Sequence, residues 1–216
     1  MEKIEYRNIS RQVGRLIEAV ATVENAQSYG GVTKKELQKI PHADWIPEIM
    51  LDYGRRRNGF GVTWRTAGKP SYNGAINLLP LTKIYGGDWA GTVYHGTPDE
   101  DPRRRCFKPV DLFAPDTCVG LYHDEHADPQ LYYYEFGEEP SPLGLDVQGY
   151  YQLLPYSLGF FHWQRLLLEL ASLAPDAPYT PYDGTARRFA QAMPALLPDF
   201  DLSALVAAYR RVRLPQ

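Results

Sequence analysis

The spacing of apolar residues changes twice along this 216-residue chain, and the order of these changes limits the folds that it can adopt. Residues 8–24 carry apolar side chains at helical spacing, which predicts an amphipathic helix. From residue 60 to residue 136, short runs rich in β-branched and aromatic residues alternate with turn sequences and predict strands. Helical spacing returns after residue 146. Helices followed by strands and then helices favour an α+β fold over alternating βαβ units.

Local signals place several of these elements. Thr33 and Glu36 have the spacing of a capping box and predict the start of a short helix. A further helix is expected over residues 43–56, with Trp45 facing inward. Residues 85–115 are rich in Gly, Pro and charge, so long loops are expected there. The predicted strands cover residues 60–64, 75–79, 117–122 and 131–136.

Negative charge is concentrated in one stretch of the chain. The formal net charge of the whole sequence is −3, which argues against a general attraction to nucleic acid. Residues 98–146 hold twelve acidic and four basic residues, so this stretch carries a net charge of −8. Such a stretch can be a system of solvated loops or an acidic face that docks a basic partner. Composition leaves both interpretations open.

One short sequence could support metal or acid–base chemistry, namely His123-Asp124-Glu125-His126-Ala127-Asp128. Imidazole and carboxylate groups can bind zinc or a harder divalent ion. However, the spacing differs from the helical His-Glu-x-x-His arrangement, and the group falls in an expected hairpin loop. We therefore expect no metal ligand, no catalytic residue and no cofactor. A metal-dependent enzyme that uses residues 123–128 stays as an alternative.

The two cysteines and the chain ends predict a cellular compartment. Cys106 and Cys118 match no zinc pattern and cannot form a disulfide framework, so reduced thiols are expected. The first residues lack the apolar run of a signal peptide. The longest apolar stretch, around residues 166–168, is too short to span a bilayer. These features predict a cytoplasmic protein with no membrane partner.

The order of several landmarks is that of a known family. The helical sequence Trp45-Ile46-Pro47-Glu48-Ile49-Met50-Leu51-Asp52-Tyr53-Gly54 leads into Asn58-Gly59-Phe60-Gly61-Val62-Thr63-Trp64, and Ile76-Asn77-Leu78-Leu79-Pro80-Leu81 follows. Later come residues 131–136, Asp146, Gly149-Tyr150, Leu153-Leu154 and Phe161-His162-Trp163. This order resembles the helices and strands of the SUKH superfamily, which is named partly for the fungal Smi and Knr cell-wall regulators.

The resemblance implies a mixed, mainly antiparallel sheet with helices packed on one side, and it implies no catalytic residues. It covers about residues 33–172. Residues 1–216 would then be a single domain, with an N-terminal helix at 8–24 and a C-terminal helical extension at about 175–216. The matched residues Gly59, Trp64 and Trp163 are expected to be structural residues of the core.

Many bacterial members of this superfamily are immunity proteins that bind and block a cognate toxin domain. The resemblance therefore implies a non-catalytic protein whose partner is a toxin domain; a regulatory or scaffold protein on the same fold is the alternative. Its oligomeric state, monomer or dimer, stays open. Acidic loops would steer a basic partner, and tyrosines would supply contacts that become buried. The predicted partner-binding residues are Asp99, Glu100, Asp101, Tyr122, Asp124, Glu125, Asp128, Tyr132, Tyr134, Glu138 and Glu139.

Overall fold

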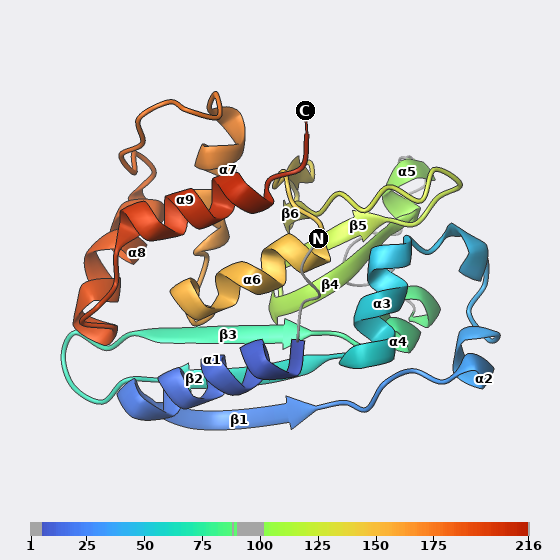
Figure 1. Ribbon diagram of the computed structural model, residues 1–216, viewed down its shortest axis with the longest axis horizontal. Helices are drawn as coiled ribbons and strands as arrows, with labels where there is room; N and C mark the ends of the chain where they lie inside the picture. The colour runs from blue at the N-terminus through green and yellow to red at the C-terminus, as the bar shows by residue number, and fades with distance from the viewer. Residues whose placement is uncertain (1–5, 88, 90–101, 216) are drawn as a thin grey trace.

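The computed structural model describes residues 6–87, 89 and 102–215 (Figure 1). Asp99, Glu100 and Asp101, predicted to bind a partner, lie outside the described residues. The strands are β1 (Thr22–Ser28), β2 (Phe60–Arg65), β3 (Asn73–Leu78), β4 (Phe107–Ala114), β5 (Thr117–Tyr122), β6 (Tyr132–Glu135) and β7 (Ser141–Pro142). The helices are α1 (Tyr6–Val20), α2 (Lys34–Leu37), η1 (Ala43–Trp45), α3 (Glu48–Arg56), α4 (Leu81–Gly86), α5 (Pro102–Arg105), α6 (Val147–Ser157), α7 (Gln164–Ser172), α8 (Gly184–Leu196) and α9 (Leu202–Val212).

The described strands form one seven-stranded sheet in which spatial order follows chain order from β1 to β7. Each neighbouring pair is antiparallel. The predicted α+β fold is therefore confirmed. β1 lies at one edge of the sheet, and a register shift between Val23 and Asn25 interrupts its ladder with β2. The two-residue β7 forms the other edge.

The N-terminal helix is shorter than the predicted range of 8–24. α1 ends at Val20, and Thr22 begins strand β1. Val23 has the spacing of the helix, yet it pairs with Trp64 of β2. β-Branched residues such as Thr22 and Val23 favour extended backbone, and pairing with β2 satisfies backbone groups that a fraying helix end would leave open.

Strand β4 occupies a segment that was expected to be part of a long loop. Lys108, Pro109 and Asp111 interrupt the apolar pattern there, so the sequence does not read as a strand. The structure buries Asp111 and satisfies its carboxyl group. Oδ1 accepts a hydrogen bond of 2.7 Å from the backbone N–H of Asn77, and Oδ2 accepts one of 2.7 Å from Tyr150 Oη. Asp111 thereby links β4 to β3 and to α6.

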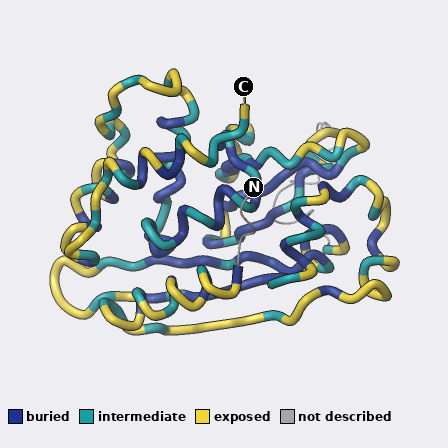
Figure 2. Tube along the Cα trace, in the orientation of Figure 1, coloured by how far each residue is buried: buried dark blue, intermediate teal, exposed yellow. Residues whose placement is uncertain are grey.

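The main core lies between the sheet and the helices. Helices α1 and α6 lie side by side over the sheet, and α9 packs on α6 (Figure 1). Figure 2 shows burial along the central strands and α6, whereas β1 and the outer side of α1 are exposed. Trp64 and Trp163 are 1% and 0% exposed, which confirms their predicted place in the core.

The C-terminal helices belong to the same core. Phe189 of α8 and Tyr209 of α9 are fully buried in one apolar cluster with Trp64 of β2. The side chain of Tyr209 donates a hydrogen bond of 2.9 Å to the carbonyl oxygen of Leu143, at the end of the sheet. The expected C-terminal extension is therefore packed on the sheet-and-helix core.

A buried carboxylate holds the proline-rich segment 173–183, which joins α7 to α8. Glu169 of α7 is 3% exposed. Its carboxylate accepts hydrogen bonds from Tyr179 Oη at 2.7 Å, from the backbone N–H of Tyr182 at 3.2 Å, and from the backbone N–H of Asp183. Arg210 and Arg213 also donate hydrogen bonds to the carbonyl oxygens of Ala177 and Leu173, so several side chains hold a segment that has no helix or strand.

Candidate functional site

The acidic loop between β5 and β6, residues 123–131, has a defined backbone. Asp124 Oδ1 accepts a hydrogen bond of 2.9 Å from the N–H of His126, and Asp128 Oδ1 accepts one of 2.9 Å from the N–H of Gln130. An aspartate side chain that accepts a hydrogen bond from the backbone N–H two residues later stabilises a turn of this kind. Glu125 and Asp128 are exposed, and Asp124 is half-buried. The loop therefore presents three carboxylates on a defined backbone.

The segment from Pro41 to Trp45 packs against the base of this loop. His123 Nε2 lies 3.3 Å from the carbonyl oxygen of Pro41, and the His123 ring lies 5.8 Å from the ring of Trp45. The indole of Trp45 stacks on the imidazole of His42, with ring centroids 4.0 Å apart. Trp45 is half-buried and His42 is exposed. A flat aromatic surface thus stands next to the acidic loop.

His123 itself is a buried residue of this region. Its ring lies 4.7 Å from the ring of Tyr85, and both side chains are at least nine-tenths buried. Within the described residues, His123 Nδ1 and Tyr85 Oη have no hydrogen-bond partner. Burial lowers the pKa of the His123 imidazole below its ordinary value. The ring is therefore neutral near pH 7 and adds no positive charge to the acidic loop.

No group of three or more His, Cys, Asp or Glu side chains that could hold a metal ion occurs among residues 6–87, 89 and 102–215. His126 and Asp128 are exposed on the loop, whereas the side chain of His123 is buried. The residues of the His123–Asp128 sequence therefore do not converge on one point.

Of the three tyrosines predicted to bind a partner, two are buried and one is half-buried. Alternate residues of β5 and β6 face opposite sides of the sheet. Tyr122 and Tyr134 are buried with Phe107 and Cys118 in a second cluster, on the side away from α6. Tyr132 is half-buried and meets the Tyr122 ring edge-on at 5.1 Å.

Helix α5 packs beside this second cluster. The guanidinium of Arg103 lies 4.4 Å from the centroid of the Tyr122 ring, and Arg104 forms an ion pair with Glu139 of the β6–β7 turn. Tyr122 and Tyr134 therefore stabilise the sheet and α5, and Tyr132 is the predicted tyrosine with the most surface in this region.

The second acidic group, Glu138 and Glu139, lies in the β6–β7 turn, at the end of β6 opposite to the acidic loop. Both residues are exposed, and Glu139 is paired with Arg104. Phe136 in the same turn is 46% exposed. A polar cavity of about 370 Å³ lies beside it, lined in part by Glu135 and Arg165, which form an ion pair. The structure thus separates the two acidic groups by the length of β6.

Sequence reasoning missed three residues of this region: Trp45, His42 and Phe136. Trp45 was expected to face the core because it has the spacing of the following helix. Instead, Trp45 ends the 3-10 turn η1, and α3 begins after Pro47. Pro47 is the signal that could have separated Trp45 from the helix, because proline disfavours helical backbone in the residue before it, here Ile46.

No protein-family model, no curated protein and no solved structure matches the chain. Among the described residues, no helix is long and apolar enough to cross a membrane.

Proposed function

We propose that this chain is a non-catalytic binding protein of the SUKH immunity type, which neutralises a cognate toxin domain in the cytoplasm. One observation carries the proposal: the acidic loop stands beside the Trp45–His42 stack. Within the described part of the chain, the carboxylates of Asp124, Glu125 and Asp128 form no ion pair. Their charge is therefore available to a partner.

Charge and aromatic surface would have separate tasks in such a complex. Several like charges in one loop attract a basic partner over about 10 Å at an ionic strength of 0.1 M, and so they raise the association rate. A half-buried indole stacked on a second ring offers a rigid contact that loses little entropy on binding and slows dissociation. The fixed backbone of the acidic loop lowers the ordering cost further.

The turn that carries Phe136 and Glu138 can belong to the same interface. β6 has four residues and is roughly 13 Å long at 3.3 Å per residue. A protein partner that buries about 800 Å² on each side can cover both ends of such a strand. The exposed Phe136 ring would then be a second aromatic contact.

The proposal predicts that a neighbouring gene encodes a toxin domain, and the test begins with that domain. Co-expression should restore growth, and the purified chain should form a complex with that domain. Glu125→Lys combined with Asp128→Lys should slow association several-fold and flatten its salt dependence, because exposed charges act mainly on the association rate. Trp45→Ala should instead raise the dissociation rate about tenfold or more.

Two controls make these results specific. Glu18→Lys combined with Asp176→Lys reverses the same number of exposed charges on other elements and should leave the kinetics unchanged. Each variant must keep the melting temperature of the parent. Failure of the chain to bind the toxin domain would refute the immunity function, and unchanged kinetics in the loop variant would refute this site.

A further inference from the structure

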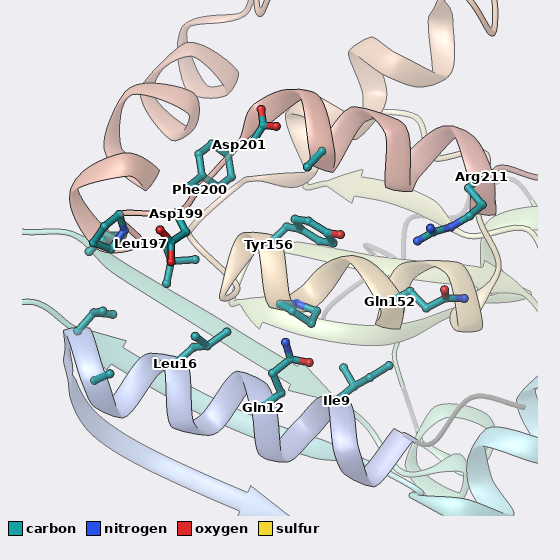
Figure 3. A pocket seen from close by; sticks show the side chains of 16 residues that line it. Ile9, Gln12, Leu16, Gln152, Tyr156, Leu197, Asp199, Phe200, Asp201 and Arg211 are labelled. Carbon is teal, nitrogen blue, oxygen red and sulfur yellow. The ribbon is translucent and has the colours of Figure 1, made fainter. Parts of the chain in front are cut away.

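A groove of about 650 Å³ runs above α6, between α1 and the connection from α8 to α9 (Figure 3). Tyr156 of α6 lies between its two walls. Leu16 of α1 lines one side, and Leu197 and Phe200 line the other. The remaining apolar lining comes from Ile9, Ala19, Val20, Pro155, Leu196, Pro198 and Ala204.

Helix α1 contributes apolar residues both to the core and to the lining of the groove. Val13 and Ile17 are fully buried in the main core. Ile9, Leu16 and Val20 belong to the same broad apolar face of the helix and are half-buried against the core, and they border the groove. Phe200, across the groove, is also half-buried and meets the ring of Phe189 edge-on. The parts of these side chains that the core leaves uncovered give the groove its apolar lining.

The two ends of the groove carry opposite charge. Asp199 and Asp201 lie at one end near Phe200, and Arg211 lies at the other (Figure 3). All three residues are exposed, and none of them forms an ion pair within the described part of the chain. Asp201 also caps α9 by accepting a hydrogen bond from the N–H of Ser203. An occupant with the opposite polarity along its length would match both ends.

We propose that this groove docks an amphipathic α-helix of a protein partner, with its acidic first turn at Arg211 and its basic last turn at Asp199 and Asp201. The helix dipole favours acidic residues in the first turn of a helix and basic residues in the last, so helices commonly carry this polarity. Apolar residues at i, i+3, i+4 and i+7 would fill the groove, as in other helix-in-groove complexes. The proposal is independent of the toxin-binding function, because the groove and the acidic loop are formed by different elements.

The first experiment selects, from a library, helices that bind the groove. A displayed library of helices of about 14 residues, with a fixed leucine stripe and randomised end residues, is selected on the full chain. Helices recovered on the parent and lost on Leu16→Glu should carry acidic residues in the first turn and basic residues in the last. Selection of helices without this bias, or of none that depends on Leu16, would overturn the proposal.

The second experiment measures the charge match with the tightest selected helix. Asp199→Lys combined with Arg211→Glu should raise the Kd of this helix about tenfold, since each exposed ion pair contributes only a modest part of the free energy of binding. A peptide with its end charges exchanged should bind this variant more tightly than it binds the parent. The original peptide should show the opposite preference. The matched control, Asp176→Lys with Arg188→Glu, reverses exposed charges outside the groove and should change nothing.

Two results would reject a partner helix as the occupant. Equal binding by the charge-reversed variant and the parent would mean that the groove takes any apolar segment. A parent that sediments as a dimer, with Leu16→Glu monomeric and equally stable to heat, would assign the groove to a second copy of this chain.

Discussion

Asp111 is a buried carboxyl group between β4 and α6, and burial raises its pKa from 3.8 to about 6. The hydrogen bonds from Asn77 and Tyr150 act in the opposite direction but do not offset burial. The folded protein therefore keeps this proton at pH values where the unfolded chain has lost it. As pH rises from about 4 to 6, the contribution of Asp111 to stability must fall.

Asp111→Asn should remove this part of the pH dependence. The asparagine oxygen can still accept from Asn77, and its NH₂ group can donate to Tyr150 Oη. Gln164 Oε1, which has no partner within the described residues, then becomes available to the Tyr150 hydroxyl after the amide turns. The free energy of unfolding of the variant, relative to the parent, should grow by roughly 2–3 kcal/mol between pH 4 and pH 7.

Urea denaturation of both proteins at several pH values measures this difference. The control is Asp116→Asn, which makes the same substitution at an exposed aspartate in the neighbouring turn. A difference between Asp111→Asn and the parent that does not change with pH would mean that the buried carboxyl has an ordinary pKa.

Some single residues were predictable because their reason is local. Gly59 follows Asn58, and both have positive φ angles, of 118° and 51°. The positive φ angle is the local reason for glycine, and packing adds to it, because a Cβ atom on Gly59 would lie 2.4 Å from Cδ2 of Tyr29. For Trp45, Pro47 is a local signal that separates it from the following helix, but the contact of its ring with His123, far along the chain, has no such signal. A contact of that kind depends on tertiary structure and leaves no local pattern.

At the level of elements, Glu169 gives the clearest prediction. Glu169→Ala leaves three donors of the segment 173–183 without their acceptor. The free energy of unfolding should fall by about 1–3 kcal/mol, and the segment should open locally. Urea denaturation measures the first effect, and the rate of chymotrypsin cleavage after Tyr179 or Tyr182 measures the second.

Glu169→Gln is the matched variant for this test. It keeps the shape of the side chain and one acceptor oxygen, so it should lie between the parent and Glu169→Ala in both measurements. If all three proteins are cleaved at the same rate, Glu169 does not hold the segment.

Elements with strong end signals were predicted well. The capping box at Thr33 forms as expected, with Thr33 Oγ1 accepting from the N–H of Glu36 at 3.2 Å. The predicted return of helical spacing after residue 146 is also confirmed, since α6 begins there and Asp146 caps it by accepting from the N–H of Gly149 at 2.7 Å. β4 failed as a prediction because its buried Asp111 is polar, and the end of α1 failed because Val23 fits both a helix and a strand. In each case a distant partner, Tyr150 or Trp64, decides the structure.

The whole molecule should unfold as one unit, because strands and C-terminal helices share one core. Trp64→Ala in β2 and Phe189→Ala in α8 should each lower stability by about 3–5 kcal/mol. Both should shift a single calorimetric transition, since neither residue belongs to a core of its own.

Calorimetry combined with far-ultraviolet circular dichroism tests this statement. Phe136→Ala, at an exposed position, is the control and should move the midpoint little. A separate early transition in Phe189→Ala, with the transition of the sheet unchanged, would instead make the C-terminal helices an independent domain.

The spatial order of the strands, in which each strand lies next to its neighbour in the chain, also affects how quickly the protein can fold. β4 and β5 are joined by Pro115 and Asp116 alone, and the connections between β2 and β3 and between β6 and β7 are short as well. The entropy lost on closing a loop grows with its length, so these pairs can form early at low cost. Folding rates fall as contacting residues lie farther apart in sequence. We therefore expect the sheet to assemble hairpin by hairpin before α1 and α6, which are far apart in the chain, pack together over it.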